Sequence, residues 1–299
     1  PAEPLRGVVS FAISPKSKGD EDKIYSSLTK LIEEDPGLRL ERNDETRQTL
    51  LTGQGQVHIE TTVEKLRRKY NVEVNLNIPK VPYKETFRKK VRVQGKHKKQ
   101  SGGHGQYGDC WVEFEPLERG TGYQFVDKIV GGVIPKTYIP AVDKGIAEAS
   151  QKGVLAGFPC IDFQAKVDDG SYHSVDSSEM AFKIAGSLAF KKAMEQADPV
   201  LLEPIMEMEV ITPEEFMGDI MGDLNSRRGR VLGMESRGKN QVVRALVPQA
   251  EVLTYAPDLR SMTGGRGMFS MQFSHYDEVP AQISQKVIEE LRGQQEQEK

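Results

Sequence analysis

The order of strand and helix patterns is the same in two segments at opposite ends of the chain, and this order constrains the fold more than any other feature. Each segment alternates as strand, helix, two strands joined by a short turn, helix and strand. The expected elements span 7–13, 20–34, 38–42, 48–52, 57–69 and 72–76 in the first segment, and 205–211, 212–226, 230–236, 241–247, 253–263 and 268–276 in the last. A β-α-β-β-α-β order is typical of ferredoxin-like modules, so the sequence predicts an α+β fold with two of them.

Local signals place the helix ends and faces in these segments. Asp20 is expected to cap the first helix of the chain. Thr212, which a proline follows, is expected to cap the first helix of the last segment. On the second helix, the spacing of Val57, Val63 and Leu66 predicts that these side chains face the core.

The middle of the chain has a different pattern. Its expected strands span 83–93, 109–116, 123–129 and 160–168, its expected helices span 138–152 and 177–196, and a further helix is expected over 281–292. At about 150 residues per domain, a chain of 299 residues predicts about two domains. The segments instead indicate a multi-domain chain with three parts, in which ferredoxin-like modules over 1–77 and 201–299 flank an α/β domain over 78–200.

Charge is segregated along the chain. The whole chain has 41 basic and 44 acidic residues, a net charge of −3, which taken alone argues against a nucleic-acid binder. Residues 84–99, however, contain eight basic residues and one acid, and residues 227–266 contain eight basic residues and three acids. The stretch 193–226 has nine acids and no lysine or arginine. This distribution favours contact with a polyanion at chosen places, although solvated surface faces would give the same pattern.

Several classes of protein are excluded by what the sequence lacks. No apolar stretch approaches the ~18 residues that span a bilayer, the first residues lack a signal-peptide pattern, and two cysteines are too few for a disulfide framework or a cysteine-based zinc site. We therefore expect a cytoplasmic protein. The five histidines lack metal-binding spacing, and no G-x-x-x-x-G-K-[ST] phosphate loop is present, so neither a metal site nor nucleotide hydrolysis is expected.

Residues 95–107 predict the tip of a long hairpin, because they are rich in Gly, His, Lys, Gln and Ser and nearly free of apolar residues. Residues 103–108 read G-x-G-x-x-G, but a strand pattern follows where a dinucleotide site needs a helix, so that site is excluded. Lysines and histidines can contact phosphates, and Gln100 and Gln106 can contact base edges or ribose. We interpret this segment as a binding tip rather than a mobile surface loop.

A second polar tip spans 170–178. Asp176, Ser177 and Ser178 are expected to cap the helix that follows, and His173 is expected to be an exposed contact residue. No G-x-S-x-G motif supports a hydrolase here. A third candidate is the basic, glycine-rich turn at 259–267, which fits both a helix C-terminus and a phosphate contact.

Several blocks together resemble the C-terminal half of bacterial elongation factor G, the translocation GTPase, in the family's order and over nearly the whole chain. They are EDP at 34–36, GQGQVHIE at 53–60, GKHKKQSGG at 95–103, GQYG at 105–108, GGVIP at 131–135, GSYH at 170–173, DSSE at 176–179, GDIMGDL at 218–224 and RRG at 227–229. Most of these blocks are weak singly, but the set is highly specific.

The resemblance implies domains III, IV and V of such a factor, with domain IV as an elongated α/β module between two ferredoxin-like modules. It implies a ribosome-binding part that promotes tRNA–mRNA translocation, and partners that are the rRNA of both subunits, tRNA and mRNA, with no membrane and a monomeric state. Positions matching the family's decoding-centre tip are Lys98, Lys99, Gln100, Ser101, Gly102, Gly103, His104, Gly105, Gln106, Tyr107, Ser171, Tyr172, His173 and Ser174. Positions matching its large-subunit rRNA contact are Arg260, Ser261, Thr263 and Arg266.

The same resemblance implies that this chain catalyses nothing and needs no cofactor, because GTP and Mg²⁺ bind a domain of the family that this sequence does not contain. Two tip positions depart from the family pattern: His104 stands where translocases commonly carry Arg, and Ser174 where they commonly carry Asp. This leaves open a paralogue that acts in ribosome recycling or in tetracycline-type ribosome protection. Alternatives of another class are a small-molecule kinase, or a ribonuclease using His104 and His173.

Overall fold

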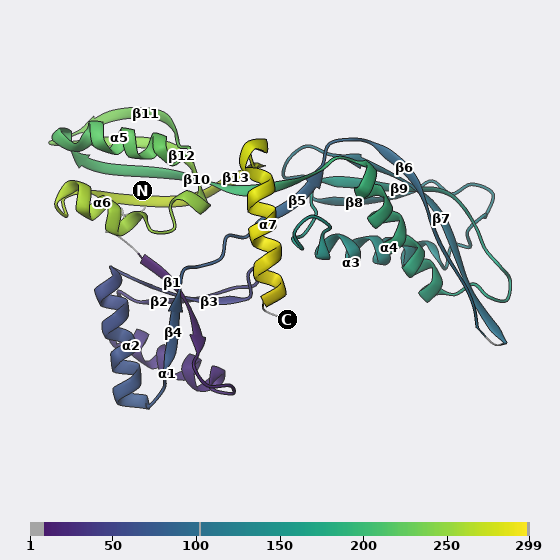
Figure 1. The fold of residues 1–299 in the computed structure, drawn as a ribbon, viewed down its shortest axis with the longest axis horizontal. Coiled ribbons are helices and arrows are strands. Elements are labelled where there is room, and N and C mark those ends of the chain that lie inside the picture. The colour runs from purple at the N-terminus through teal and green to yellow at the C-terminus, as the bar shows by residue number, and fades with distance from the viewer. Residues whose placement is uncertain (1–8, 102, 298–299) are drawn as a thin grey trace. The chain divides into compact units, whose positions relative to one another are not determined.

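The computed structural model describes residues 9–101 and 103–297, which form two compact units. Unit 1 consists of residues 9–82 and 204–275, and unit 2 consists of the described residues of 83–203 and 276–297. The described residues form three sheets with helices packed on them, a mixed α+β architecture of the class that the sequence predicts (Figure 1). No helix among the described residues is long and apolar enough to cross a bilayer.

The first sheet of unit 1 has the strand order β2-β3-β1-β4, with two helices packed on it. Its elements are β1 Val9–Pro15, α1 Glu21–Glu34, β2 Arg39–Asn43, β3 Gln48–Gly53, α2 Gln56–Tyr70 and β4 Val74–Asn77. This is the predicted β-α-β-β-α-β order. Its core contains Leu28, Leu51, Ile59 and Leu66, and the three last are fully buried.

One local prediction for this segment was wrong, and another was confirmed only in position. Val57 is 69% exposed, because α2 directs Ile59, Thr62 and Leu66 inward and Val57 lies two residues, or about 200° of helix rotation, before Ile59. Asp20 is the N-cap residue of α1, as predicted, although its side chain makes no capping hydrogen bond.

The second β-α-β-β-α-β segment forms a sheet of order β11-β12-β10-β13. Its elements are β10 Pro199–Pro213, α5 Met217–Ser226, β11 Arg230–Arg237, β12 Asn240–Pro248, α6 Tyr255–Thr263 and β13 Met268–Glu278. Thr212 is not the expected N-cap. It pairs with Gln241 as part of β10, and a 3₁₀ turn over Glu214–Phe216 precedes the helix, which begins only at Met217.

Unit 2 contains a sheet of order β6-β7-β9-β8 with α3 and α4 packed on it. Its elements are β5 Lys84–Phe87, β6 Val91–Ser101, β7 His104–Pro116, β8 Tyr123–Asp127, α3 Ile139–Lys152, β9 Phe163–Ser171, α4 Glu179–Gln196 and α7 Ala281–Gln297. The single strand expected over 83–93 is therefore two strands. The chain turns between them at 88–90, where the amides of Arg88 and Lys89 donate to the carbonyl of Ala197, and β5 pairs with the beginning of β10.

The expected polar tip at 95–107 is mostly regular structure. Strands β6 and β7 remain paired from Val91 and Phe114 to Ser101 and His104, and they form the long hairpin in Figure 1. Gly95 serves the packing of α4, because a Cβ at this position would overlap the carbonyl oxygen of Ala185. Glycine thus lets the helix backbone lie directly against the hairpin.

Candidate nucleic-acid interface

The hairpin end and the second polar tip lie together in unit 2, although about seventy residues separate them in sequence. The amide of Tyr107 donates to the carbonyl of Asp176 at 2.9 Å, and the amide of Gly105 donates to Asp176 Oδ1 at 3.2 Å. Ser177 Oγ donates to the carbonyl of Tyr107 at 2.9 Å. The structure therefore brings both sets of expected tip residues into one site, which we call the unit 2 tip (residues 96–107 and 171–178).

A directional chain of hydroxyl hydrogen bonds fixes the base of the unit 2 tip. Ser171 Oγ donates to Asp109 Oδ2 at 2.6 Å, because an ionised carboxylate only accepts. Ser171 Oγ therefore accepts the bond from the Tyr107 hydroxyl, at 2.7 Å. The other oxygen of Asp109 accepts from Gln94 Nε2 at 2.7 Å. The hydroxyls of Tyr107 and Ser171 thus hold the site together.

Asp109, 6% exposed, is a residue of this site that the sequence did not reveal. An acidic side chain in an alternating strand is usually solvent-facing, and β7 buries both Asp109 and its neighbour Cys110. The aspartate before Cys110 could have been singled out only by knowing that Ser171 pairs opposite it, which is a contact between β7 and β9.

The three expected capping residues of α4 divide into two roles. Ser178 is the N-cap, and its Oγ accepts from the amide of Ala181 at 3.1 Å, as predicted. Asp176 and Ser177 instead join the second tip to the hairpin, so their polar atoms serve the site more than the helix.

Cations without local counterions cover the outer part of the unit 2 tip. Lys96, Lys98 and Lys99 are exposed, and none has an acidic partner among the described residues. The Lys96 ammonium lies 5.6 Å from the centre of the Tyr107 ring. Such a group of unpaired ammonium groups attracts phosphate.

The remaining tip residues differ in their availability. His104, Gln100 and Gln106 are exposed, and Gln106 Oε1 lies 2.8 Å from His97 Nε2. Tyr172 is 51% exposed and Ser174 is exposed as well. Gly102 lies outside the described residues, as does the side chain of Ser101.

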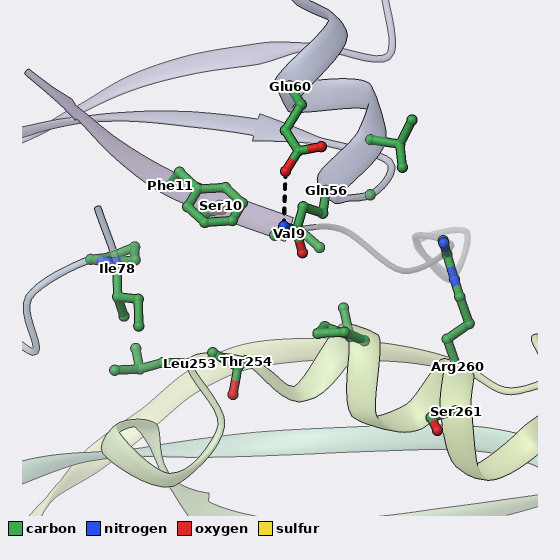
Figure 2. Close-up of a pocket in the computed structure, with 15 residues that line it drawn as sticks. Val9, Ser10, Phe11, Gln56, Glu60, Ile78, Leu253, Thr254, Arg260 and Ser261 are labelled. Carbon is green, nitrogen blue, oxygen red and sulfur yellow. Dashed lines mark hydrogen bonds between the residues drawn. The ribbon is translucent and has the colours of Figure 1, made fainter. Parts of the chain in front are cut away.

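The third candidate lies in unit 1, at the end of α6. Arg260 and Ser261 line a cavity of about 540 Å³, and Figure 2 shows both on one turn of that helix. Arg266 pairs with Glu215 at 2.6 Å. Thr263 is fully buried, and its hydroxyl donates to the carbonyl of Leu259 and accepts from the amide of Gly267, so its side chain closes the helix and is not available to a partner.

Comparison with protein families matches almost the whole chain to one factor. Residues 6–78 match the model of elongation factor G domain III, residues 79–198 match domain IV, and residues 200–287 match the elongation factor G C-terminus. The chain belongs to the elongation factor G family. It is therefore related to the translational GTPases, and the unit 2 tip lies within the domain IV match.

A solved structure supports the same assignment. This chain is 52% identical in sequence to a protein from Thermus thermophilus whose crystal structure is known. The match covers 95% of this chain, with a TM-score of 0.84. The chain spans 42% of the length of that protein.

Proposed function

We propose that this chain is the ribosome-binding part of a translation factor that promotes movement of tRNA and mRNA during elongation. It would comprise three modules over 1–77, 78–200 and 201–299. The observation that supports the proposal most is the unit 2 tip, where the hairpin segment presents unpaired lysines and is hydrogen-bonded to a second polar segment, within a region that matches elongation factor G domain IV.

The chemistry of the tip suits RNA. Lysines at positions 96, 98 and 99 can neutralise phosphates, and exposed Gln100, His104 and Tyr172 add donors and an aromatic face for ribose and bases. Arg260 and Ser261 are proposed as the contact with large-subunit rRNA. This part of the factor would catalyse nothing itself, with GTP and Mg²⁺ bound by a GTPase domain elsewhere in the factor, acting in the cytoplasm.

A paralogue acting in recycling or ribosome protection is the second candidate, and the exposed His104 and Ser174 favour it. At position 104, a titratable imidazole would replace the always-charged arginine of the family pattern. At position 174, a hydroxyl would replace a carboxylate. Pre-steady-state translocation by the full-length factor separates the two candidates, because only a translocase moves tRNA and mRNA at a rate that supports elongation.

Binding of the chain to small ribosomal subunits, measured over a range of salt concentrations, tests the proposal directly. We expect Lys98→Ala combined with Lys99→Ala to weaken binding and to reduce the slope of log K against log salt by about 1–2, since each removes one phosphate contact. The matched control is Lys191→Ala with Lys192→Ala, two adjacent exposed lysines on α4 of the same unit.

Equal slopes for the two double variants would argue against the tip as the RNA contact. Saturable binding of ATP, or cleavage of RNA by the purified chain, would instead support the kinase or ribonuclease alternatives.

A further inference from the structure

His173 presents its imidazole at the end of the unit 2 tip in a fixed backbone setting. The side chain is 54% exposed. The amide of His173 donates to Ser177 Oγ at 2.9 Å, and the carbonyl of His173 accepts from the amide of Ser177 at 3.1 Å. The Tyr107 ring lies 6.4 Å away, centre to centre, and is tilted by 54° against the imidazole. These contacts restrict where the imidazole can point.

One ring nitrogen of His173 is already occupied within the loop. Nδ1 lies 3.3 Å from the amide nitrogen of Val175 and 3.2 Å from that of Asp176, and both amides donate to it. An imidazole nitrogen that accepts hydrogen bonds carries no proton. A neutral ring in this position therefore carries its proton on Nε2.

The carboxylate of Asp176, which lies near the ring, does not reverse this assignment. Asp176 Oδ2 lies 3.5 Å from His173 Nδ1, farther than either amide, while Oδ1 of the same carboxylate holds the amide of Gly105. A proton on Nδ1 would also leave the amides of Val175 and Asp176 without their acceptor and directed at an N–H. The two backbone donors together outweigh one long contact to the carboxylate.

We propose that His173 is held as the Nε2–H tautomer and acts as a single, outward hydrogen-bond donor to an acceptor oxygen of RNA. Among the described residues, Nε2 has no hydrogen-bond partner of its own. The imidazole is thus positioned to donate through Nε2. The tautomer follows from the loop alone, whereas the identity of the acceptor rests on the proposed function.

The tautomer can be measured on the chain by itself. In ¹⁵N-histidine NMR spectra at about pH 8, where an ordinary imidazole is neutral, we expect the His173 signals to show an unprotonated Nδ1 and a protonated Nε2. The His173→Ala variant identifies these signals among the five histidines. A protonated Nδ1 at this pH would overturn the proposal.

The role of the donor is tested by two amide variants that differ in reach. His173→Gln places an N–H near the position of Nε2, and His173→Asn places one near the position of Nδ1. For binding to small subunits that carry mRNA and tRNA, we expect His173→Gln to stay within about twofold of the wild type and His173→Asn to lose about three- to tenfold, the value of one hydrogen bond. Equal losses in both variants would overturn the donor role.

The two experiments separate this inference from the proposed function. If the unaltered chain fails to bind the small subunit while the NMR spectra show protonated Nε2, the proposed function fails and the fixed tautomer stands.

Discussion

The buried carboxylate of Glu85 provides a sharp test of how unit 2 is held together. Glu85 is 1% exposed, and its carboxylate accepts four hydrogen bonds from the backbone of the loop after α3. Oε2 accepts from the amides of Val154 at 2.7 Å and Leu155 at 3.0 Å, and Oε1 accepts from those of Ala156 at 2.9 Å and Phe158 at 3.1 Å. One side chain thus satisfies four backbone donors of an irregular segment.

The Glu85→Gln variant removes half of this acceptor capacity at nearly constant volume. The amide nitrogen of Gln cannot accept, so two of the four backbone N–H groups lose their partner. Each unsatisfied buried donor costs about 1–3 kcal/mol, so the loss amounts to roughly 2–6 kcal/mol. Removing a buried charge offsets part of this, and we expect a net destabilisation of about 2–4 kcal/mol.

Urea unfolding followed by tryptophan fluorescence measures this loss of unfolding free energy in unit 2. Trp111 is the single tryptophan of the chain and lies on β7, in unit 2 with Glu85. With a slope of about 2 kcal/mol per molar urea, the midpoint of Glu85→Gln should fall by about 1–2 M. The control Glu118→Gln changes an exposed glutamate of the same unit and should stay within about 0.5 kcal/mol of the wild type. Equal midpoints for the two variants would refute the argument that the four backbone bonds stabilise the loop.

Two further changes test the packing of the hairpin and an ion pair of unit 1. Gly95→Ala should destabilise unit 2 by about 1–3 kcal/mol, because the new Cβ would overlap the carbonyl of Ala185, whereas Gly233→Ala, with no heavy atom within 4 Å of its Cβ, should have a smaller effect in thermal unfolding. The hydrogen bond from His58, 2.8 Å long, lowers the pKa of Asp35 from its usual 3.8. Because the folded pKa is lowered, the ionised Asp35 carboxylate stabilises the fold above pH 3.8, and this stabilisation is lost as the pH falls through the folded pKa. Asp35→Asn should therefore be less stable than the wild type at neutral pH. That difference should shrink below pH 3.8 in circular-dichroism melts, and a difference that is constant with pH would contradict the linkage.

Local periodicity predicted most elements of the fold. The predicted helices over 20–34, 138–152 and 177–196 match α1, α3 and α4 to within two residues, because helical spacing of apolar side chains depends only on neighbouring residues. Ser178, one of the three predicted capping residues, is the N-cap of α4, and this could be predicted locally because its cap bond spans only three residues.

Strand pairing decided what the sequence left wrong or unseen. Thr212 has the residue type of an N-cap, yet pairing with Gln241 on β12 keeps it in a strand. The polar segment after Gly95 was expected to be an irregular hairpin tip, yet its strands remain paired as far as Ser101 and His104. In both cases strand pairing supplies hydrogen bonds that outweigh the local preference.

The candidate site shows the same division. The sequence by itself determined which residue types occupy the two tips, the basic charge of the hairpin tip and, through its blocks, the family to which the chain belongs. Only the tertiary structure decided that Asp176 joins Gly105 across seventy-one positions, and that a buried Asp109 orients Ser171 and Tyr107. The physical reason is that a hydrogen bond depends on distance and direction in space, and spacing along the chain carries neither for residues brought together by a sheet.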